Sequence, residues 1–394
     1  MQIPFAKPYL TGDEGDAVAE VIRSGWVSQG PKVREFEAAF AARVGAADAV
    51  ATTSCTSALQ LALYASGVGP GDEVIVPSLS FIATANAVWQ CGATPVFADI
   101  DPLTYNLDPA SAERAITPRT RAIMPVHQLG LPADMDEFLE LGRTRDLAIV
   151  EDAACAIGAT YKGRPVGSIG PIACFSFHPR KVITTGEGGM IAVRDAELGA
   201  RLRRLRAHGM DVSDLARHNA RTVIIETYPE RGWNYRMTDM QAALGLCQLR
   251  ILDEVLERRR QIAERYNEAI AGLDQLETPY EPPDRMRTWQ SYCVRITPNA
   301  ELDRTTLMEL LLEDGIPTRR GVMACHEELS YAAPTDAAQP TSLPHTEAAT
   351  RDTLMLPLFA GMSAQQHYYV LNRLRTHLNA APASLAAAAS PTLA

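Results

Sequence analysis

The sequence lacks the features that mark several classes of protein. Nowhere in its 394 residues do about 18 apolar residues run together, so we expect no membrane span. The start, MQIPFAKPYLTGDEGD, has no basic stretch followed by an apolar run, so we expect no secretory signal. No GxxxxGK[ST] phosphate loop occurs, and no internal repeat of about 20–50 residues is visible. Solenoids and P-loop nucleotide hydrolases are therefore excluded.

Basic residues and paired cysteines are also scarce. Lys and Arg number 37 against 47 Asp and Glu, a net charge of −10, which disfavours sequence-independent binding to nucleic acid. In the basic run 201–206, the arginines are expected to lie on a solvated helix face with Leu202 and Leu205 opposite. Seven cysteines, none in a CxxC pair, indicate reduced thiols in a cytoplasm. No His, Asp or Glu cluster has metal-ligand spacing, so no metal is expected.

Short apolar runs alternate with helix-length segments between about residues 50 and 195. The runs are EVIVPS (73–78), TPVFADID (94–101), RAIMPVH (121–127), LAIVEDA (147–153), IACFSFH (172–178) and MIAVRD (190–195). They are apolar almost throughout, which predicts strands buried on both faces of a mainly parallel sheet. The intervening helical segments make this an α/β fold of repeated βαβ units. Ligands of such sheets bind at the carboxyl ends of the strands.

The rest of the chain predicts a second, smaller domain. Segment 239–272 has Leu, Ile and Ala at helical spacing with few breakers, which predicts a long helix. We expect it to carry the chain from a large domain, 1–250, into a smaller C-terminal α/β domain, 251–378. The Ala-rich end, 379–394, is of low complexity and is expected to be a disordered tail.

The stretch from Ser176 to Gly189, SFHPRKVITTGEGG, is the most informative in the chain. A strand runs into a polar cluster with one lysine, Lys181, and then into a Gly-rich turn. Lysine forms Schiff bases with carbonyls when burial or neighbouring groups lower its pKa from about 10.4. A surface lysine beside a glycine hairpin is the alternative interpretation.

Two other strand ends carry polar residues that could bind a ligand. The run LAIV delivers Glu151 and Asp152 to the sheet edge, where a carboxylate could pair with the ring nitrogen of pyridoxal phosphate. It could equally cap a helix. Hydroxyl residues at 52–57 precede an Ala/Leu helix, whose start could bind a phosphate or simply be capped by these side chains.

In order and spacing these three stretches resemble the DegT/DnrJ/EryC1/StrS family of sugar aminotransferases over about residues 8–375. Further family-like blocks are PSLSFIATAN (77–86), GATPVFADID (92–101), PVHQLG (125–130) and GWNYRMTDMQAA (232–243). The resemblance implies the type I, aspartate aminotransferase-like fold of pyridoxal 5'-phosphate (PLP) enzymes.

The resemblance also implies roles for individual residues at the cofactor. Lys181 matches the lysine that forms the Schiff base and then moves protons, and Asp152 matches the carboxylate that keeps the pyridine nitrogen protonated. Phe81 occupies the place of an aromatic ring stacked on the cofactor. The groups that match phosphate-binding residues are Cys55, Thr56 and Ser176.

Other residues relate this chain to particular branches of the family. Asn234 matches a residue that reaches the phosphate of a neighbouring subunit, which implies a homodimer with shared active sites. Cys155 departs from the pattern, because relatives commonly carry Gln or His where the side chain meets the cofactor's 3′ oxygen. His178 resembles the residue of enzymes that aminate C4 and is assigned a catalytic and substrate role. His326 and Arg320 are assigned to the substrate side.

The resemblance implies a transaminase that moves an amino group from an amino acid, most simply L-glutamate, to a nucleotide-linked keto-deoxy sugar. Position C4 is favoured, and amination at C3 is an alternative. A non-transaminating PLP enzyme, such as a dehydratase or epimerase, and a cofactor-binding regulatory protein are the remaining alternatives. Some relatives replace the lysine with His and catalyse deoxygenation, and Lys181 argues against that branch.

Overall fold

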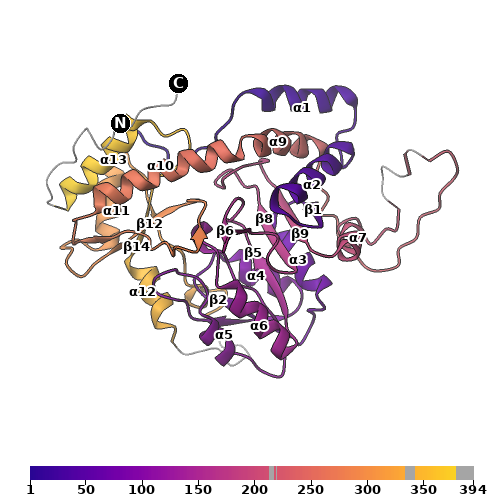
Figure 1. Cartoon of the computed structure of the whole chain (residues 1–394), viewed down its shortest axis with the longest axis horizontal. Helices are drawn as coiled ribbons and strands as arrows, with labels where there is room; N and C mark the ends of the chain where they lie inside the picture. Colours follow the sequence, from indigo (N-terminus) through magenta and orange to yellow (C-terminus); the bar gives the residue numbers. More distant parts are fainter. Residues whose placement is uncertain (213–216, 219, 333–341, 379–394) are drawn as a thin grey trace.

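A seven-stranded sheet forms the centre of the molecule (Figure 1), in the order β1-β9-β8-β5-β4-β2-β3. The computed structural model describes residues 1–212, 217–218, 220–332 and 342–378. The strands of this sheet are β1 (Asp48–Thr52), β2 (Glu73–Pro77), β3 (Thr94–Ala98), β4 (Thr120–Ile123), β5 (Ala148–Asp152), β8 (Ile172–Ser176) and β9 (Gly189–Val193). Pairs β2–β3, β2–β4, β4–β5 and β5–β8 are parallel, whereas β9 runs antiparallel to both β8 and β1. The predicted α/β fold with a mainly parallel sheet is confirmed.

Helices cover both faces of this sheet, which explains why its strands are apolar at nearly every position. Ile75 and Ile149 pack in one apolar cluster, and their neighbours Val74 and Val150 pack in a second cluster on the opposite face. Residues of α2 (Pro31–Val44), α5 (Pro109–Arg114), α6 (Met135–Arg145) and α9 (Asp239–Arg250) belong to the first cluster. Residues of α3 (Cys55–Ala65), α4 (Ala83–Gln90) and α7 (Ala196–Leu205) belong to the second.

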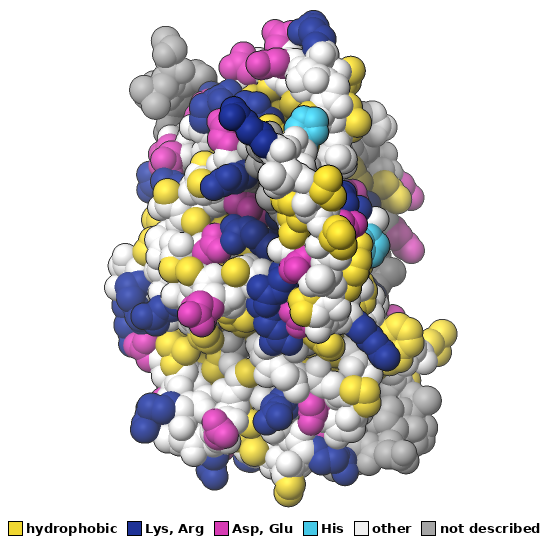
Figure 2. Space-filling model, turned by 90° about the vertical axis from the view of Figure 1, so that its right-hand side faces the viewer, with side chains coloured by type: hydrophobic (Ala, Val, Ile, Leu, Met, Phe, Trp, Pro, Cys, Tyr) yellow, Lys and Arg dark blue, Asp and Glu magenta, His cyan; other side chains and the backbone are white. Residues whose placement is uncertain are grey.

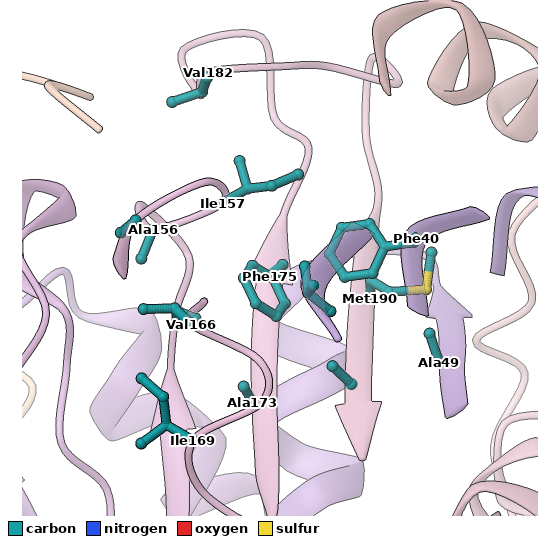
Figure 3. Close-up of a cluster of buried hydrophobic side chains, with 14 of the residues drawn as sticks. Phe40, Ala49, Ala156, Ile157, Val166, Ile169, Ala173, Phe175, Val182 and Met190 are labelled. Carbon is teal, nitrogen blue, oxygen red and sulfur yellow. The ribbon is translucent and has the colours of Figure 1, made fainter. Parts of the chain in front are cut away.

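Aromatic residues fill the core between α2 and strands β1, β9 and β8 (Figure 3). The Phe40 ring lies 5.0 Å from the Phe175 ring of β8 in an edge-to-face arrangement. Met190 of β9 and Ala49 of β1 complete this part of the cluster, and all four residues are fully buried. This packing fixes the position of β8, which ends at the site described below.

The C-terminal part builds a second core around a four-stranded antiparallel sheet, β10-β12-β14-β13. Its strands are β10 (Leu276–Glu277), β12 (Tyr292–Ile296), β13 (Arg319–Arg320) and β14 (Thr353–Leu356). The helices here are α10 (Leu252–Ile270), α11 (Arg304–Glu313), α12 (Pro344–Asp352) and α13 (Ala364–His377). Ile3 is buried in the same apolar cluster, and its N–H donates to the Gly315 carbonyl. The N-terminus accordingly lies close to α13 (Figure 1).

A small third sheet, β11-β6-β7, connects the two parts of the molecule. β11 (Arg285–Met286) pairs with β6 (Thr160–Tyr161), which pairs with β7 (Arg164–Pro165). The remaining N-terminal helix is α1 (Asp13–Ser24), which packs on α9. Two short 3-10 turns are Gln128–Gly130 and Cys325–Glu327.

Two sequence expectations about helices need correction. The single helix expected over 239–272 is two helices, because the chain turns at Ile251, where φ is −100° and ψ is 6°. Arg206, expected on a solvated face, is only 3% exposed and pairs with the buried carboxylate of Glu37. Arg203 also pairs with Glu37 of α2 and with Asp48 of β1, because both carboxylates lie next to α7.

No helix in the parts of the chain that the structure describes is long and apolar enough to cross a membrane. The expected tail, 379–394, lies outside the described residues. Figure 2 shows acidic and basic side chains interspersed over the face on the α7 side of the molecule.

Candidate active site

A cavity of about 480 Å³ lies where the carboxyl ends of the parallel strands face the C-terminal sheet. Residues that follow β2, β4, β5 and β8 line one side, and residues of β13, β14 and their flanking loops line the other. This is the edge at which ligands of parallel sheets bind. The sequence-predicted residues among its walls are Cys55, Thr56, Phe81, Asp152, Cys155, Ser176, His178, Lys181 and Arg320.

Asp152, the last residue of β5, is held on one side of this cavity with 5% exposure. Its Oδ2 accepts a hydrogen bond from the Thr84 hydroxyl at 2.9 Å, and its Oδ1 accepts one from the Ala154 N–H at 3.1 Å. Burial raises the pKa of the Asp152 carboxyl, and these two hydrogen bonds act in the opposite direction because they stabilise the carboxylate.

Glu151, the residue before it, has a different environment. It is fully buried and accepts hydrogen bonds from the Gly170 N–H at 2.8 Å and from His127 Nε2 at 2.9 Å. His127 Nδ1 accepts the Ala133 N–H at 3.0 Å, so the proton that His127 shares with Glu151 is on Nε2. Of the two adjacent carboxylates, only that of Asp152 lines the cavity.

Lys181 enters the cavity from the turn after β8, and its Nζ lies 3.2 Å from Cys155 Sγ. Burial by itself lowers the pKa of the Lys181 ammonium, but Cys155, Cys55 and Asp152 outweigh burial and the net direction is upward. From the sequence, surroundings that lower this pKa were expected, and the structure gives the opposite direction. The cause is the set of acidic groups that the fold gathers around Nζ. Lys181 therefore carries a proton at neutral pH until something removes it.

The start of α3 forms a third wall of the cavity. Ser54 caps the helix by accepting the Ser57 N–H at 3.1 Å, and Cys55 and Thr56 are the first helical residues. A Cβ at Gly189 would lie 2.5 Å from the carbonyl group of Ser54, so only glycine lets β9 approach this turn so closely. Backbone N–H groups at a helix start attract anions. Ser176, at the end of β8, lines the same cavity and adds a hydroxyl group to this wall.

Phe81 follows β2 and is 61% exposed, unusual for an aromatic side chain at the base of a helix. It lines the cavity and is not part of the packed core. Its ring offers an apolar face of the kind on which a flat heteroaromatic ligand stacks.

The residues assigned to the substrate side are distributed differently. His178 lines the cavity, and burial lowers the pKa of its imidazole. Arg320 also lines it and pairs with Glu328 at 2.7 Å. His326 does not: its Nδ1 lies 2.6 Å from the hydroxyl of buried Ser78, behind the wall.

Asn234 is exposed and does not line the cavity of its own chain. An isolated β-bridge pairs it with Ala207, which lies just after α7. Its assigned role, in the site of a neighbouring subunit, needs a second copy and stays a prediction.

The cavity also contains residues that the sequence argument did not single out. Arg180, Arg319, Gln290 and Phe5 line its C-terminal side, and the Arg319 guanidinium lies 5.2 Å from the Phe5 ring. Phe5 and Gln290 come from distant parts of the chain that reach the cavity only through the C-terminal fold. No local spacing in the sequence signals such an approach. Arg180 stands beside Lys181, and its position next to the lysine is the one signal that could have pointed to it.

These side chains fit PLP. A flat pyridine ring carrying an aldehyde and a phosphate needs a lysine, a buried carboxylate, an apolar ring face and a phosphate cradle. Lys181, Asp152, Phe81 and the start of α3 provide one of each around a single cavity. Within the described residues, no group of three or more His, Cys, Asp or Glu side chains is arranged to hold a metal ion.

The fold and the site define a PLP-dependent transferase of the type I, aspartate aminotransferase-like class. A model of the DegT/DnrJ/EryC1/StrS aminotransferase family matches residues 8–375, and the chain belongs to that family. It is therefore an aminotransferase that acts on a nucleotide sugar and uses PLP as its cofactor.

Individual relatives match over nearly their full length. The chain is 44% identical to GDP-perosamine synthase of Caulobacter vibrioides, covering 92% of this chain and 94% of the relative. It is 41% identical to the spore coat polysaccharide biosynthesis protein SpsC of Bacillus subtilis, with 92% and 93% covered. The solved structure of DesV from S. venezuelae, in complex with a ketimine intermediate, is 38% identical with a TM-score of 0.85, covering 95% of this chain and 98% of DesV.

Proposed function

We propose that this aminotransferase moves the amino group of L-glutamate to C4 of a nucleotide-linked 4-keto-deoxy sugar. The observation that carries the proposal is the placement of Lys181 and Asp152 on one cavity, with His178 beside them. In the family resemblance, this histidine followed by ITTGEGG is typical of C4 enzymes. The relative named GDP-perosamine synthase, at 44% identity, supports a nucleotide-linked amino sugar as the product.

The residues around the cavity divide the work. Bound PLP supplies an electron sink and an aldehyde that accepts the amino group. Lys181 would hold this aldehyde through Nζ, and its amine would move protons at the reacting carbon. Asp152 keeps the pyridine nitrogen protonated, and Phe81 supports the ring. The groups that hold the phosphate are Ser176, Cys55 and Thr56.

Cys155 helps to keep the Lys181 amine protonated before the reaction. Its Sγ is within hydrogen-bond distance of Nζ, and the pKa of the ammonium is raised in these surroundings. The Lys181 ammonium must therefore release a proton before Nζ attacks a carbonyl. A thiol is a weaker hydrogen-bonding group than the Gln or His of relatives, so Cys155 holds the 3′ oxygen of the ring less strongly.

A homodimer in the cytoplasm is the proposed form of the enzyme. Residues 220–230, between α7 and α9, include Val223 at 92% exposure and Ile225 at 83%, in a part of the chain that extends away from the sheet (Figure 1). Apolar side chains exposed to this degree indicate an interface, and a second copy is the occupant that also gives Asn234 a phosphate to bind. All seven cysteines are unpaired, as suits a reducing compartment.

The reaction is tested by incubating the PLP-loaded enzyme with [15N]glutamate and a panel of nucleotide-linked 4-keto and 3-keto deoxy sugars. We expect equimolar 2-oxoglutarate and a product with 15N on C4, located by NMR. Amination at C3 would overturn the position, a stronger reaction with another amino acid would overturn the donor, and glutamate consumption without nitrogen transfer would overturn the reaction.

Shared sites are tested by mixing two inactive variants, Lys181→Ala and Asn234→Ala. In a mixed dimer, one site receives both intact residues and the other receives neither. Random exchange of subunits should restore about a quarter of wild-type activity, because half of the dimers are mixed and each has one working site. No recovery after exchange would contradict sharing.

A further inference from the structure

Two buried hydroxyl groups connect the turn after β2 to the carboxylate of Asp152. Ser80 and Thr84 are each 1% exposed. Their hydroxyl oxygens are 2.7 Å apart, and Thr84 Oγ1 is 2.9 Å from Asp152 Oδ2. None of the sequence motifs interpreted above assigned a role to either hydroxyl.

The chemistry of these groups fixes the direction of both hydrogen bonds. An ionised carboxylate only accepts, so Thr84 must donate its single hydroxyl proton to Asp152. The proton between the two hydroxyls then comes from Ser80. The hydrogen-bond chain thus runs from the Ser80 hydroxyl to the Thr84 hydroxyl and from there to the Asp152 carboxylate.

Residues of the C-terminal part of the protein hold Ser80, the first donor of this hydrogen-bond chain. The Ser80 N–H donates to the Met323 carbonyl at 3.2 Å, and Cys325 Sγ donates to the Ser80 carbonyl at 3.3 Å. His326, assigned to the substrate side from sequence, binds the hydroxyl of Ser78 in the same turn. The segment 323–326 therefore holds the turn that carries Ser80.

We propose that Thr84, supported by Ser80, is a positioning residue that keeps Asp152 ionised and oriented toward the pyridine nitrogen of the cofactor. The inference rests on the proposed role of Asp152. Without a donor on Oδ2, a carboxylate buried to this degree would favour its protonated form and would no longer stabilise a cationic ring.

The other groups around Asp152 do not remove the need for this donor. Lys181 and His127 face it and lower the pKa of its carboxyl, whereas burial raises that pKa and is the largest influence. The thiols of Cys55 and Cys174 also lie close enough to interact with it. Lys181 would be engaged by the cofactor aldehyde, whereas Thr84 would continue to donate its hydrogen bond to Asp152.

The test compares PLP dissociation constants of the wild type and Thr84→Val across about pH 5–9, by equilibrium dialysis. Valine keeps the branched shape and removes the hydroxyl. A rise of about one unit in the carboxyl pKa should weaken binding by up to about tenfold at the acid end of this range. The ratio of variant to wild-type constants should fall toward one as the pH rises, because alkaline solution ionises Asp152 without help. A structural defect would not depend on pH in this way.

Three matched variants complete the experiment. Thr84→Ser keeps the donor and should stay within about twofold of the wild type. Ser80→Ala should change the constant in the same direction as Thr84→Val but less. Thr346→Val removes another fully buried hydroxyl that binds a carboxylate, that of Asp99 at 2.8 Å, away from the cavity, and should leave PLP binding unchanged.

A Thr84→Val protein whose PLP constant equals that of Thr346→Val at every pH would overturn the inference and leave the proposed function standing. Weakening by the same factor at every pH would also overturn it. A wild type that fails to bind PLP would overturn both.

Discussion

His367 of α13 should make the C-terminal part of the fold, built on the β10-β12-β14-β13 sheet, sensitive to acid. Its imidazole is 1% exposed and lies against the Tyr266 ring, with 4.3 Å between ring centroids. Burial lowers the pKa of this imidazole from 6.5 to about 4, since a charged ring cannot be solvated there. The nearby Arg265 acts in the same direction.

The sign and size of the effect follow from proton linkage. Below pH 6.5 the unfolded chain binds a proton at His367 and the folded chain does not until about pH 4. Stability is therefore present above pH 6.5 and lost as the pH falls toward 4. Integrating between about pH 7.5 and 5 gives a loss of about 2 kcal/mol from this one residue.

The measurement is the free energy of unfolding in urea at both pH values, for the wild type and His367→Leu. Trp289 lies in the same apolar cluster, so its share of the tryptophan fluorescence reports on this part of the fold. The wild type should lose about 2 kcal/mol more than the variant over this interval. His345→Leu, a change at an exposed histidine, is the control and should behave as the wild type. Equal losses in the wild type and His367→Leu would refute the assignment of a buried, neutral imidazole.

Three further predictions concern the site and its support. Lys181→Ala should lower kcat by more than about 10³-fold and leave no borohydride-reducible PLP on the protein, which mass spectrometry of the digest would show; appreciable turnover would contradict the assignment. Gly189→Ala should weaken PLP binding in a fluorescence titration, because its Cβ would meet the Ser54 carbonyl at 2.5 Å and displace the start of α3; unchanged affinity would show that this turn does not hold the phosphate. Glu37→Ala should cost about 3–5 kcal/mol in urea denaturation, because it leaves Arg206 buried without its partner; a loss below about 1 kcal/mol would show that the cation is compensated elsewhere.

Much of the central sheet could be read from local patterns. The six apolar runs became β2, β3, β4, β5, β8 and β9, because strands covered on both faces must be apolar at successive positions. β1 was not among them, since its Ala-rich residues do not stand out from the helices around it. The turn at Ile251 was also missed, because no Pro or Gly marks it.

The site shows the same division. Lys181, Asp152 and the start of α3 each follow or precede an element whose pattern is visible, so their convergence at one sheet edge follows from a parallel sheet. His326 was placed on the substrate side by sequence, whereas the fold turns it toward Ser78. Phe5, Gln290 and the Ser80–Thr84 chain depend on contacts between distant segments, which no local spacing encodes.

By itself, the sequence determined the fold class, the family and the residues proposed to meet the cofactor, because those depend on periodicity and on motifs within short segments. Only the tertiary structure decided the surroundings of Lys181, the hydrogen bonds of Asp152 and His127, and the burial of His367. These properties arise from burial and from neighbours up to hundreds of residues apart in the chain. Electrostatic energies depend on distance and on exclusion of water, and folding alone sets both.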